Sequence, residues 1–170
     1  ASNNLGVETI DVTSGQVTGS GSTQITINPR TDLAEQTEYY VQIAATAFDD
    51  SADNSYLGIS DKTSLSFATA DETAPIINGL SGSAGASTST TSVDENVTTV
   101  GTFTTTNETV TWSLNGGADA LLFSINSSSG ALSFSSAPDY ESPRDSNSGN
   151  DYVVVVRAKD SAGNPSDQTV

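Results

Sequence analysis

The chain has 170 residues, of which 21 are Asp or Glu and only 5 are Lys or Arg, so its formal net charge is −16. This acidity argues against nucleic acid and anionic membrane surfaces as partners, because both attract basic patches. The chain has no Cys and no His, which excludes disulfides, Cys–His catalysis and zinc motifs. No apolar run approaches the roughly 20 residues of a membrane-spanning helix, so we expect no membrane insertion.

The distribution of apolar residues predicts an all-β fold. Apolar and polar residues alternate with period two between turns rich in Gly, Asn, Asp and Ser, and helical periodicity is nearly absent. Short strands separated by frequent turns are typical of β-sandwiches. In chain order, the expected strands are residues 7–12, 23–28, 39–47, 65–69, 98–104, 109–114, 122–126, 131–134 and 151–159, with another opening at Pro75.

A break near Asp71 and Pro75 divides the chain, because Pro interrupts the strand pattern there. We therefore expect two tandem Greek-key β-sandwiches, residues 1–72 and residues 73–170. The first has fewer strands before residue 7 than a complete sandwich needs, and a last strand would only begin at residues 167–170. We expect a fragment of a longer protein, and leave open whether the first domain borrows a strand from another chain.

Carboxylates gather in the predicted loops, and this is the strongest chemical signal in the chain. Closely spaced carboxylates repel one another unless a cation lies between them, and oxygen ligands on irregular backbone suit Ca²⁺. The candidate calcium ligands are Asp49, Asp50, Asp71, Glu72, Glu95, Asp139, Glu141 and Asp160.

Asp139 and Glu141 form the clearest pair among these candidates. They lie on one side of an extended segment, about 6–7 Å apart at strand rise, and Glu95 can join them from another loop. The alternative is a solvated acidic loop, and we favour calcium because a third carboxylate is expected nearby.

The remaining carboxylates are open to other interpretations. Asp71 and Glu72 could hold Ca²⁺ between the domains together with the Asp160 loop, or form an ordinary solvated linker. Asp49 and Asp50 offer several oxygens in one loop, but Asp and Asn also favour turns through hydrogen bonds to their own backbone. A pair of acids could also serve a glycosidase, but that reaction needs a deep cleft on a larger scaffold.

The second domain resembles bacterial cadherin-like repeats over nearly its whole length. The resemblance rests on residues 95–96, 100–102, 123–125, 130–132, 139–141 and 156–160, taken in order. In that family, Glu95, Asp139 and Glu141 would bind Ca²⁺ at one end of the sandwich, together with the linker that follows. Asp160 would lie at the opposite end and face the preceding linker.

The first domain looks like the bacterial Ig-like domains of large secreted adhesins of the RTX type. Residues 33–43, 47–50 and 65–69 carry this resemblance. Together the resemblances imply calcium-stabilised extender modules of an extracellular bacterial surface adhesin, without enzymatic activity. The expected partners are neighbouring domains of the same chain, with carbohydrate or protein on a target surface as further options. The alternative function is a carbohydrate- or peptide-binding module, either of such an adhesin or of a secreted polysaccharide-degrading enzyme.

Overall fold

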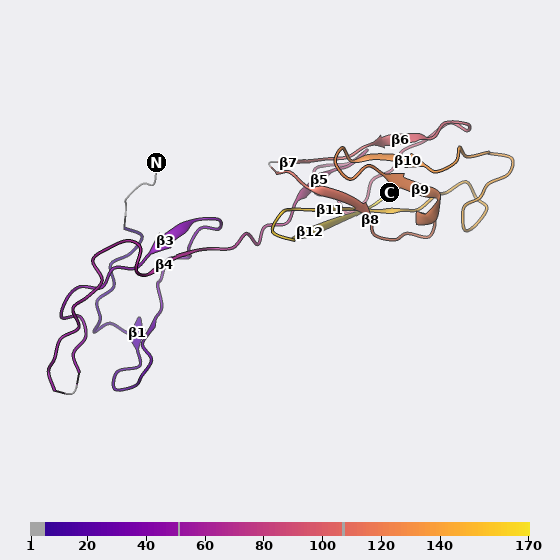
Figure 1. Ribbon diagram of the computed structural model, residues 1–170. Coiled ribbons are helices and arrows are strands. Elements are labelled where there is room, and N and C mark those ends of the chain that lie inside the picture. The colour runs from indigo at the N-terminus through magenta and orange to yellow at the C-terminus, as the bar shows by residue number, and fades with distance from the viewer. Residues whose placement is uncertain (1–5, 51, 107) are drawn as a thin grey trace. The chain divides into compact units, whose positions relative to one another are not determined.

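The computed structural model describes residues 6–50, 52–106 and 108–170. The chain forms two compact units, Ala1–Asp71 and Glu72–Val170, here called unit 1 and unit 2. Every sheet is antiparallel, and the described residues contain a single short 3₁₀ turn, Ala120–Leu122 (Figure 1). The predicted all-β fold is confirmed.

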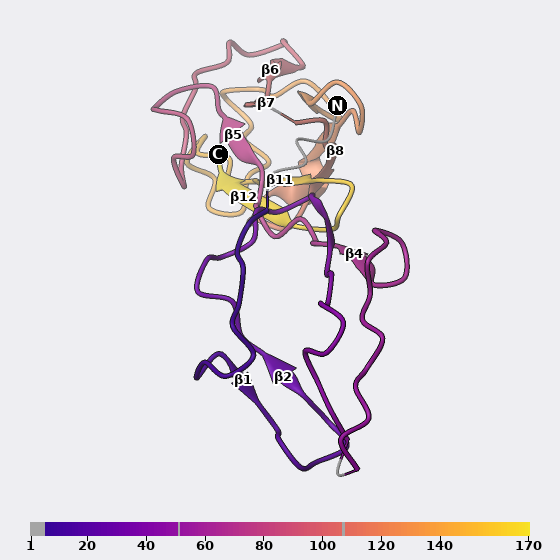
Figure 2. The ribbon, with the colours of Figure 1, turned by 90° about the vertical axis from the view of Figure 1, so that its left-hand side faces the viewer.

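Unit 1 is built from two short ladders joined by long loops (Figure 2). β1 (Val17–Thr18) pairs with β2 (Thr26–Ile27), and β3 (Glu38–Tyr40) pairs with β4 (Ser66–Ala68). The rings of Tyr39 and Phe67 pack across the second ladder with centroids 5.9 Å apart. No described residue of unit 1 is buried, so this unit presents little apolar core.

The described residues of unit 2 form eight strands. They are β5 (Ile76–Asn78), β6 (Thr99–Thr102), β7 (Thr104–Thr106), β8 (Thr111–Leu114), β9 (Phe123–Ile125), β10 (Ala131–Phe134), β11 (Val155–Lys159) and β12 (Pro165–Thr169).

The strands of unit 2 form two layers. One layer has the order β6-β10-β9, and β7, separated from β6 only by Phe103, pairs with β5. The other layer has the order β12-β11-β8. This is the strand order of a seven-stranded Greek-key sandwich, with β6 and β7 together taking the place of one strand.

The core of unit 2 lies between the two layers. Alternate residues of each strand point inward, as a half-buried sheet requires, so Leu132, Val156 and Ala158 are fully buried. Phe123 stacks on Phe134 with centroids 4.4 Å apart, and Tyr152 meets Phe134 edge-on at 5.0 Å. The remaining buried apolar residues are Ile77, Phe103, Trp112 and Val154.

Several expected strands differ from the observed ones. Residues 7–12 form no ladder, because Glu8 instead accepts hydrogen bonds from the Gln16 amide and the Arg30 N–H. The strand expected at residues 151–159 is observed over Val155–Lys159, and Val154 extends its pairing by exchanging two backbone hydrogen bonds with Val170. The Val153 N–H instead donates to the carboxylate of Asp119. The last strand, β12, begins at Pro165 rather than at residue 167.

Candidate metal centre

Three carboxylates converge at one end of unit 2, and we call Glu95, Asp139 and Glu141 the tip cluster. Each offers a carboxylate oxygen, and these oxygens all lie within 4.8 Å of one another. Glu95 precedes β6, whereas Asp139 and Glu141 lie in the long loop between β10 and β11. Figure 1 shows that loop at the end of unit 2 opposite the β7–β8 and β11–β12 turns. All three side chains are exposed, so a cation can reach them from solvent.

Backbone hydrogen bonds hold the two loops of the tip cluster together. The Asn96 N–H donates to the Pro138 carbonyl at 2.9 Å, and the Tyr140 N–H donates to Glu95 Oε2 at 3.2 Å. The Glu141 N–H donates to Asp139 Oδ1 at 3.1 Å. Two of these bonds end on the carboxylates of Glu95 and Asp139, so the cluster itself helps to hold the surrounding backbone in place.

The geometry of the tip cluster fits a calcium ion. Oxygen ligands bind Ca²⁺ at 2.3–2.6 Å, so two ligands on opposite sides of the ion lie about 4.6–5.2 Å apart. Oxygens within 4.8 Å of one another can therefore share one ion. Zn²⁺ favours nitrogen and sulfur ligands, and the chain has neither His nor Cys. Three ionised carboxylates this close repel one another, and a divalent cation would remove that repulsion.

Asp160 lies at the other end of unit 2 and is buried. Its Oδ1 accepts the N–H groups of Gly163 and Asn164 at 2.6 and 2.8 Å, and its Oδ2 accepts the Asn164 side-chain amide at 2.8 Å. Burial raises the pKa of Asp160, but these hydrogen bonds outweigh burial and place the pKa below its ordinary value. Asp160 thus has a structural role in its own turn.

Glu108, which the sequence interpretation missed, comes close to Asp160. Carboxylate oxygens of the two residues lie within 4.8 Å of each other, because the β7–β8 and β11–β12 turns lie at the same end of unit 2. The signal in the sequence is an acidic residue in each of two turns that the Greek-key order brings together.

Asp71 is the last residue of unit 1 and Glu72 the first of unit 2. A calcium site shared by these residues and the Asp160 loop would join the two units, and it stays a prediction.

The hydrogen bonds in the loop at Asp49 and Asp50 are those of a turn that is closed by one of its own Asp side chains. Asp50 Oδ1 accepts the N–H groups of Ala52 and Asn54, and the Asn54 side-chain amide donates to Asp50 Oδ2 at 2.9 Å. These bonds, led by that of the Asn54 side chain, lower the pKa of Asp50. Ser51, in the same predicted cluster, lies outside the described residues. Within the part of this loop that is described, the acidic side chains do not form a group of three within 4.8 Å.

Two buried carboxylates, Asp119 and Asp145, support the loop that carries the tip cluster. Asp119 accepts the N–H groups of Ser146 and Val153 at 2.6 and 2.7 Å. Asp145 accepts the N–H groups of Gly149 and Asn150 at 2.9 and 3.3 Å. The sequence predicts a plain turn at residues 145–150, and nothing in it distinguishes these carboxylates from solvated ones.

Comparisons with known proteins bear on unit 1. Residues 2–69 match the family model described as a bacterial Ig-like domain, which supports the predicted Ig-like domain in this part of the chain. Neither the search of curated proteins nor the search of solved structures found a match. Among the described residues, no helix has the length and apolar character needed to cross a membrane. The cadherin-like resemblance of unit 2 stays a prediction.

Proposed function

We propose that the chain is a pair of non-catalytic, extracellular spacer modules of a bacterial surface adhesin, and that unit 2 is stabilised by Ca²⁺ at the tip cluster. The bacterial Ig-like match of residues 2–69 supports the spacer class. The observation that carries the calcium part is the convergence of Glu95, Asp139 and Glu141 from two separate loops.

The mechanism we propose is mechanical. Without Ca²⁺ the tip carboxylates repel one another and loosen the loops that carry them. With Ca²⁺ the charges are neutralised, and the loop before β6 is tied to the loop between β10 and β11. A neighbouring domain of the same long chain could supply the oxygens that complete six to eight ligands. We further propose that calcium at the Asp71–Glu72 junction would restrict hinging between modules.

The size of the effect follows from mass action. Extracellular calcium modules have dissociation constants of about 10⁻⁴–10⁻³ M. At a free calcium concentration about 100-fold above the dissociation constant, one site adds about 2.7 kcal/mol to the free energy of unfolding. For a unit of this size that corresponds to a rise in melting temperature of roughly 10–20 °C.

The experiment is thermal unfolding followed by the fluorescence of Trp112, which lies in the core of unit 2. We expect Ca²⁺ to raise the melting temperature of the native chain over that in EDTA, and Glu141→Gln to remove most of this rise. Asp94→Asn is the matched control, because it removes the same charge beside Glu95 but outside the tip cluster. Equal melting temperatures with Ca²⁺ and with EDTA would contradict the proposal.

A further inference from the structure

The chain contains two Asn–Gly pairs, Asn78–Gly79 and Asn115–Gly116. In such a pair the backbone nitrogen of the glycine can attack the asparagine side-chain amide, because glycine has no side chain to crowd the approach. Each pair follows an apolar residue, so the sequence alone does not distinguish them. The structure does, because the two pairs have different surroundings.

Asn115 and Gly116 lie in an exposed turn directly after β8. The Asn115 N–H donates to the Val155 carbonyl, and the Val155 N–H donates to the Gly116 carbonyl, both at 2.8 Å. Two residues therefore face one across the ladder, as in a β-bulge. The Gly116 N–H makes no hydrogen bond with any described residue, so the attacking nitrogen is free.

The turn also has room for ring closure. Gly116 has a φ of +108°, and an added Cβ would meet nothing within 4 Å. Within the described part of the chain, the Asn115 side chain makes one hydrogen bond, from Nδ2 to Asp167 Oδ2 at 3.0 Å. That bond engages the nitrogen that would leave rather than the carbon that would be attacked.

Asn78–Gly79 is held much more firmly. Asn78 is the last residue of β5 and lies opposite Thr104 of β7. Its side-chain amide donates to Thr106 Oγ1 at 3.1 Å and to Thr104 Oγ1 at 3.4 Å. Gly79 packs against the buried Gln168, and an added Cβ would overlap Gln168 Oε1. Ring closure at Asn78 would therefore have to disrupt the end of the β5–β7 ladder.

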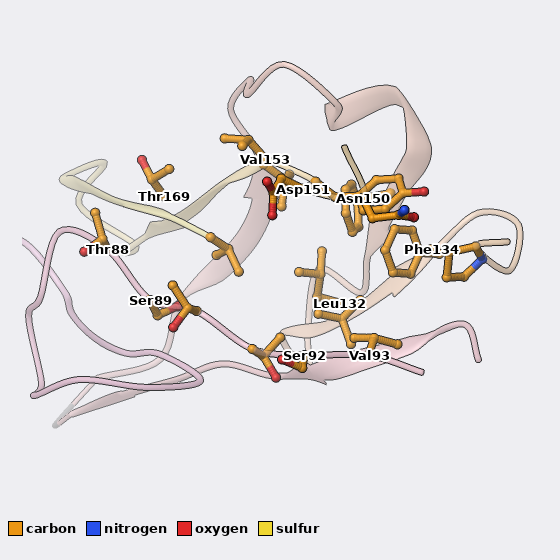
Figure 3. Close-up of a pocket in the computed structure, with 18 of the residues that line it drawn as sticks. Thr88, Ser89, Ser92, Val93, Leu132, Phe134, Asn150, Asp151, Val153 and Thr169 are labelled. Carbon is orange, nitrogen blue, oxygen red and sulfur yellow. The ribbon is translucent and has the colours of Figure 1, made fainter. Parts of the chain in front are cut away.

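Asn150 provides a further comparison. It lines a pocket of about 570 Å³ in unit 2, where Figure 3 shows it beside Asp151. The Asp151 side chain crowds its own backbone nitrogen, and the Asn150 side-chain amide donates to the Tyr140 carbonyl at 3.1 Å. Neither the following residue nor the hydrogen bonding favours ring closure at Asn150.

We propose that Asn115 is a site of spontaneous deamidation, a modification in which water is the only co-reactant. The Gly116 backbone nitrogen loses its proton to a solvent base and bonds to Asn115 Cγ. The Cγ–Nδ2 bond breaks, and Nδ2 takes up a proton from solvent and leaves as ammonia. The product is a cyclic imide, and no group is oxidised or reduced.

Water then opens the imide at one of its two carbonyl carbons. Attack at Cγ breaks the new bond and leaves an aspartate at position 115 in a normal backbone. Attack at the main-chain carbonyl carbon breaks the original peptide bond and leaves isoaspartate, whose main chain is longer by one methylene group. In either case the amide and water become an acid and ammonia.

Both products change the contacts of the bulge. The donor to Asp167 becomes a carboxylate, which competes with Asp167 for the Arg157 guanidinium that already donates to both of its oxygens. In isoaspartate the Asn115 N–H and the Gly116 carbonyl are further apart, so their two bonds to Val155 no longer fit one residue. Deamidation therefore adds a negative charge and loosens the end of the β8–β11 ladder.

The experiment incubates the whole chain in mildly alkaline, calcium-free buffer. Peptide mass spectrometry follows conversion at each asparagine, and enzymatic methylation detects isoaspartate. In the folded chain we expect Asn115 to convert about tenfold or more faster than Asn78, because only Asn115 has a free, accessible attacking nitrogen. In guanidinium chloride the two rates should become similar, and this control separates the effect of the fold from that of the sequence.

Two variants test the mechanism. Asn115→Gln keeps the amide but requires a larger ring, and Gly116→Ala crowds the attacking nitrogen with a methyl group. Each should suppress conversion at this turn and leave conversion at Asn78 unchanged. Because Gly116→Ala also raises the energy of the backbone at positive φ, Asn115→Gln is the deciding variant if the alanine variant fails to fold.

The consequence for the ladder is measured on the deamidated form, separated from the native chain by anion exchange. Hydrogen exchange at the Val155 amide should be faster in the isoaspartate form than in the native chain, because its bond to the Gly116 carbonyl is lost. Unchanged exchange at Val155 would overturn the proposed effect on the ladder.

Two results would overturn the proposed site itself. One is conversion of Asn115 in the folded chain that is no faster than that of Asn78. The other is isoaspartate that persists at an undiminished level in Asn115→Gln. None of these measurements involves calcium, so their failure leaves the proposed function untouched.

Discussion

At the scale of single residues, buried carboxylates in unit 2 act as acceptors for backbone N–H groups. Asp119, Asp145 and Asp160 each satisfy donors in turns that have no ladder partner. For Asp145 and Asp160, burial raises the pKa, but the accepted hydrogen bonds outweigh burial and leave the pKa below its ordinary value. These residues therefore fix the loops from inside unit 2, whereas the carboxylates of the tip cluster are exposed to solvent.

We predict that Asp145→Asn destabilises unit 2 at neutral pH. Burial raises the pKa of Asp145, but the N–H groups of Gly149 and Asn150 outweigh burial and leave the pKa below the ordinary value for Asp. Because the folded pKa lies below the unfolded one, the stabilisation is complete above the unfolded pKa and is lost as the pH falls through the folded pKa. The variant should melt several degrees lower at pH 7, and the difference in melting temperature from the native chain should shrink as the pH falls below the ordinary pKa of Asp.

The control for this prediction is Asp151→Asn, which removes the same charge from the same loop. The difference in melting temperature between Asp145→Asn and the native chain could instead stay constant between pH 7 and pH 3. That result would show that the ionised carboxylate is not the source of the effect.

The residues of the tip cluster could be predicted from the sequence, and the anchoring residues could not. Asp139 and Glu141 are two residues apart in an extended segment, so their spacing alone places both carboxylates on one side. Asp119 and Asp145 look like ordinary loop residues, and only the fold shows that both are buried and that Asp119 is bonded across 27 and 34 positions of sequence.

At the scale of elements, the ladder of β8, β11 and β12 organises unit 2. Arg157 lies directly opposite Asp167 in the register of β11 and β12, and its guanidinium donates two hydrogen bonds of 2.7 Å to that carboxylate. The side-chain hydrogen bond from Arg157 lowers the pKa of Asp167. The pair is partly exposed, so it contributes register more than stability.

Turn geometry in unit 2 gives a second prediction. Gly130, in the turn between β9 and β10, has a φ of +70°, and an added Cβ would lie 2.5 Å from the Phe103 carbonyl oxygen. Gly130→Ala should therefore lower the free energy of unfolding by more than the roughly 1 kcal/mol expected from a positive φ alone. Urea unfolding followed by Trp112 fluorescence measures this change.

Gly116→Ala separates the two causes. Gly116 has a φ of +108°, but an added Cβ would meet nothing within 4 Å. If Gly116→Ala destabilises unit 2 as much as Gly130→Ala does, close approach to Phe103 contributes nothing.

The strands of unit 2 follow the sequence pattern more closely than those of unit 1. β8, β9 and β10 all lie within predicted strands, because alternating large apolar residues there face a real core. In unit 1, residues 7–12 carry three apolar residues, Val7, Ile10 and Val12, yet Asp11 accepts the Thr13 N–H at 2.8 Å and the chain turns. Hydrogen bonds that an Asp side chain accepts from nearby backbone N–H groups compete with strand pairing where the strand would bury little apolar surface.

At the scale of the whole molecule, the two units differ in how much apolar surface they bury. Unit 2 contains nine buried apolar residues, whereas no described residue of unit 1 is buried. Burial is the main favourable term in folding, so the stability of the two units should differ accordingly. The chain should not unfold as one cooperative body.

We predict that amide hydrogen exchange separates the two units. Amides of β10 and β11 in unit 2 should exchange only through global unfolding of that unit, whereas amides of β3 and β4 in unit 1 should exchange far faster. Mass spectrometry of peptic fragments resolves this difference. Equal protection in β4 and β11 would show that unit 1 is stabilised by contacts other than burial of its own side chains.

The most direct test of the account is a calcium titration by isothermal calorimetry on the whole chain. We predict saturable binding with a dissociation constant of about 10⁻⁴–10⁻³ M. Glu95→Gln and Glu141→Gln should each weaken that binding severely, and Asp94→Asn should leave it intact. Absence of binding heat at millimolar calcium, or binding that survives both substitutions, would contradict the claim that the tip cluster holds calcium.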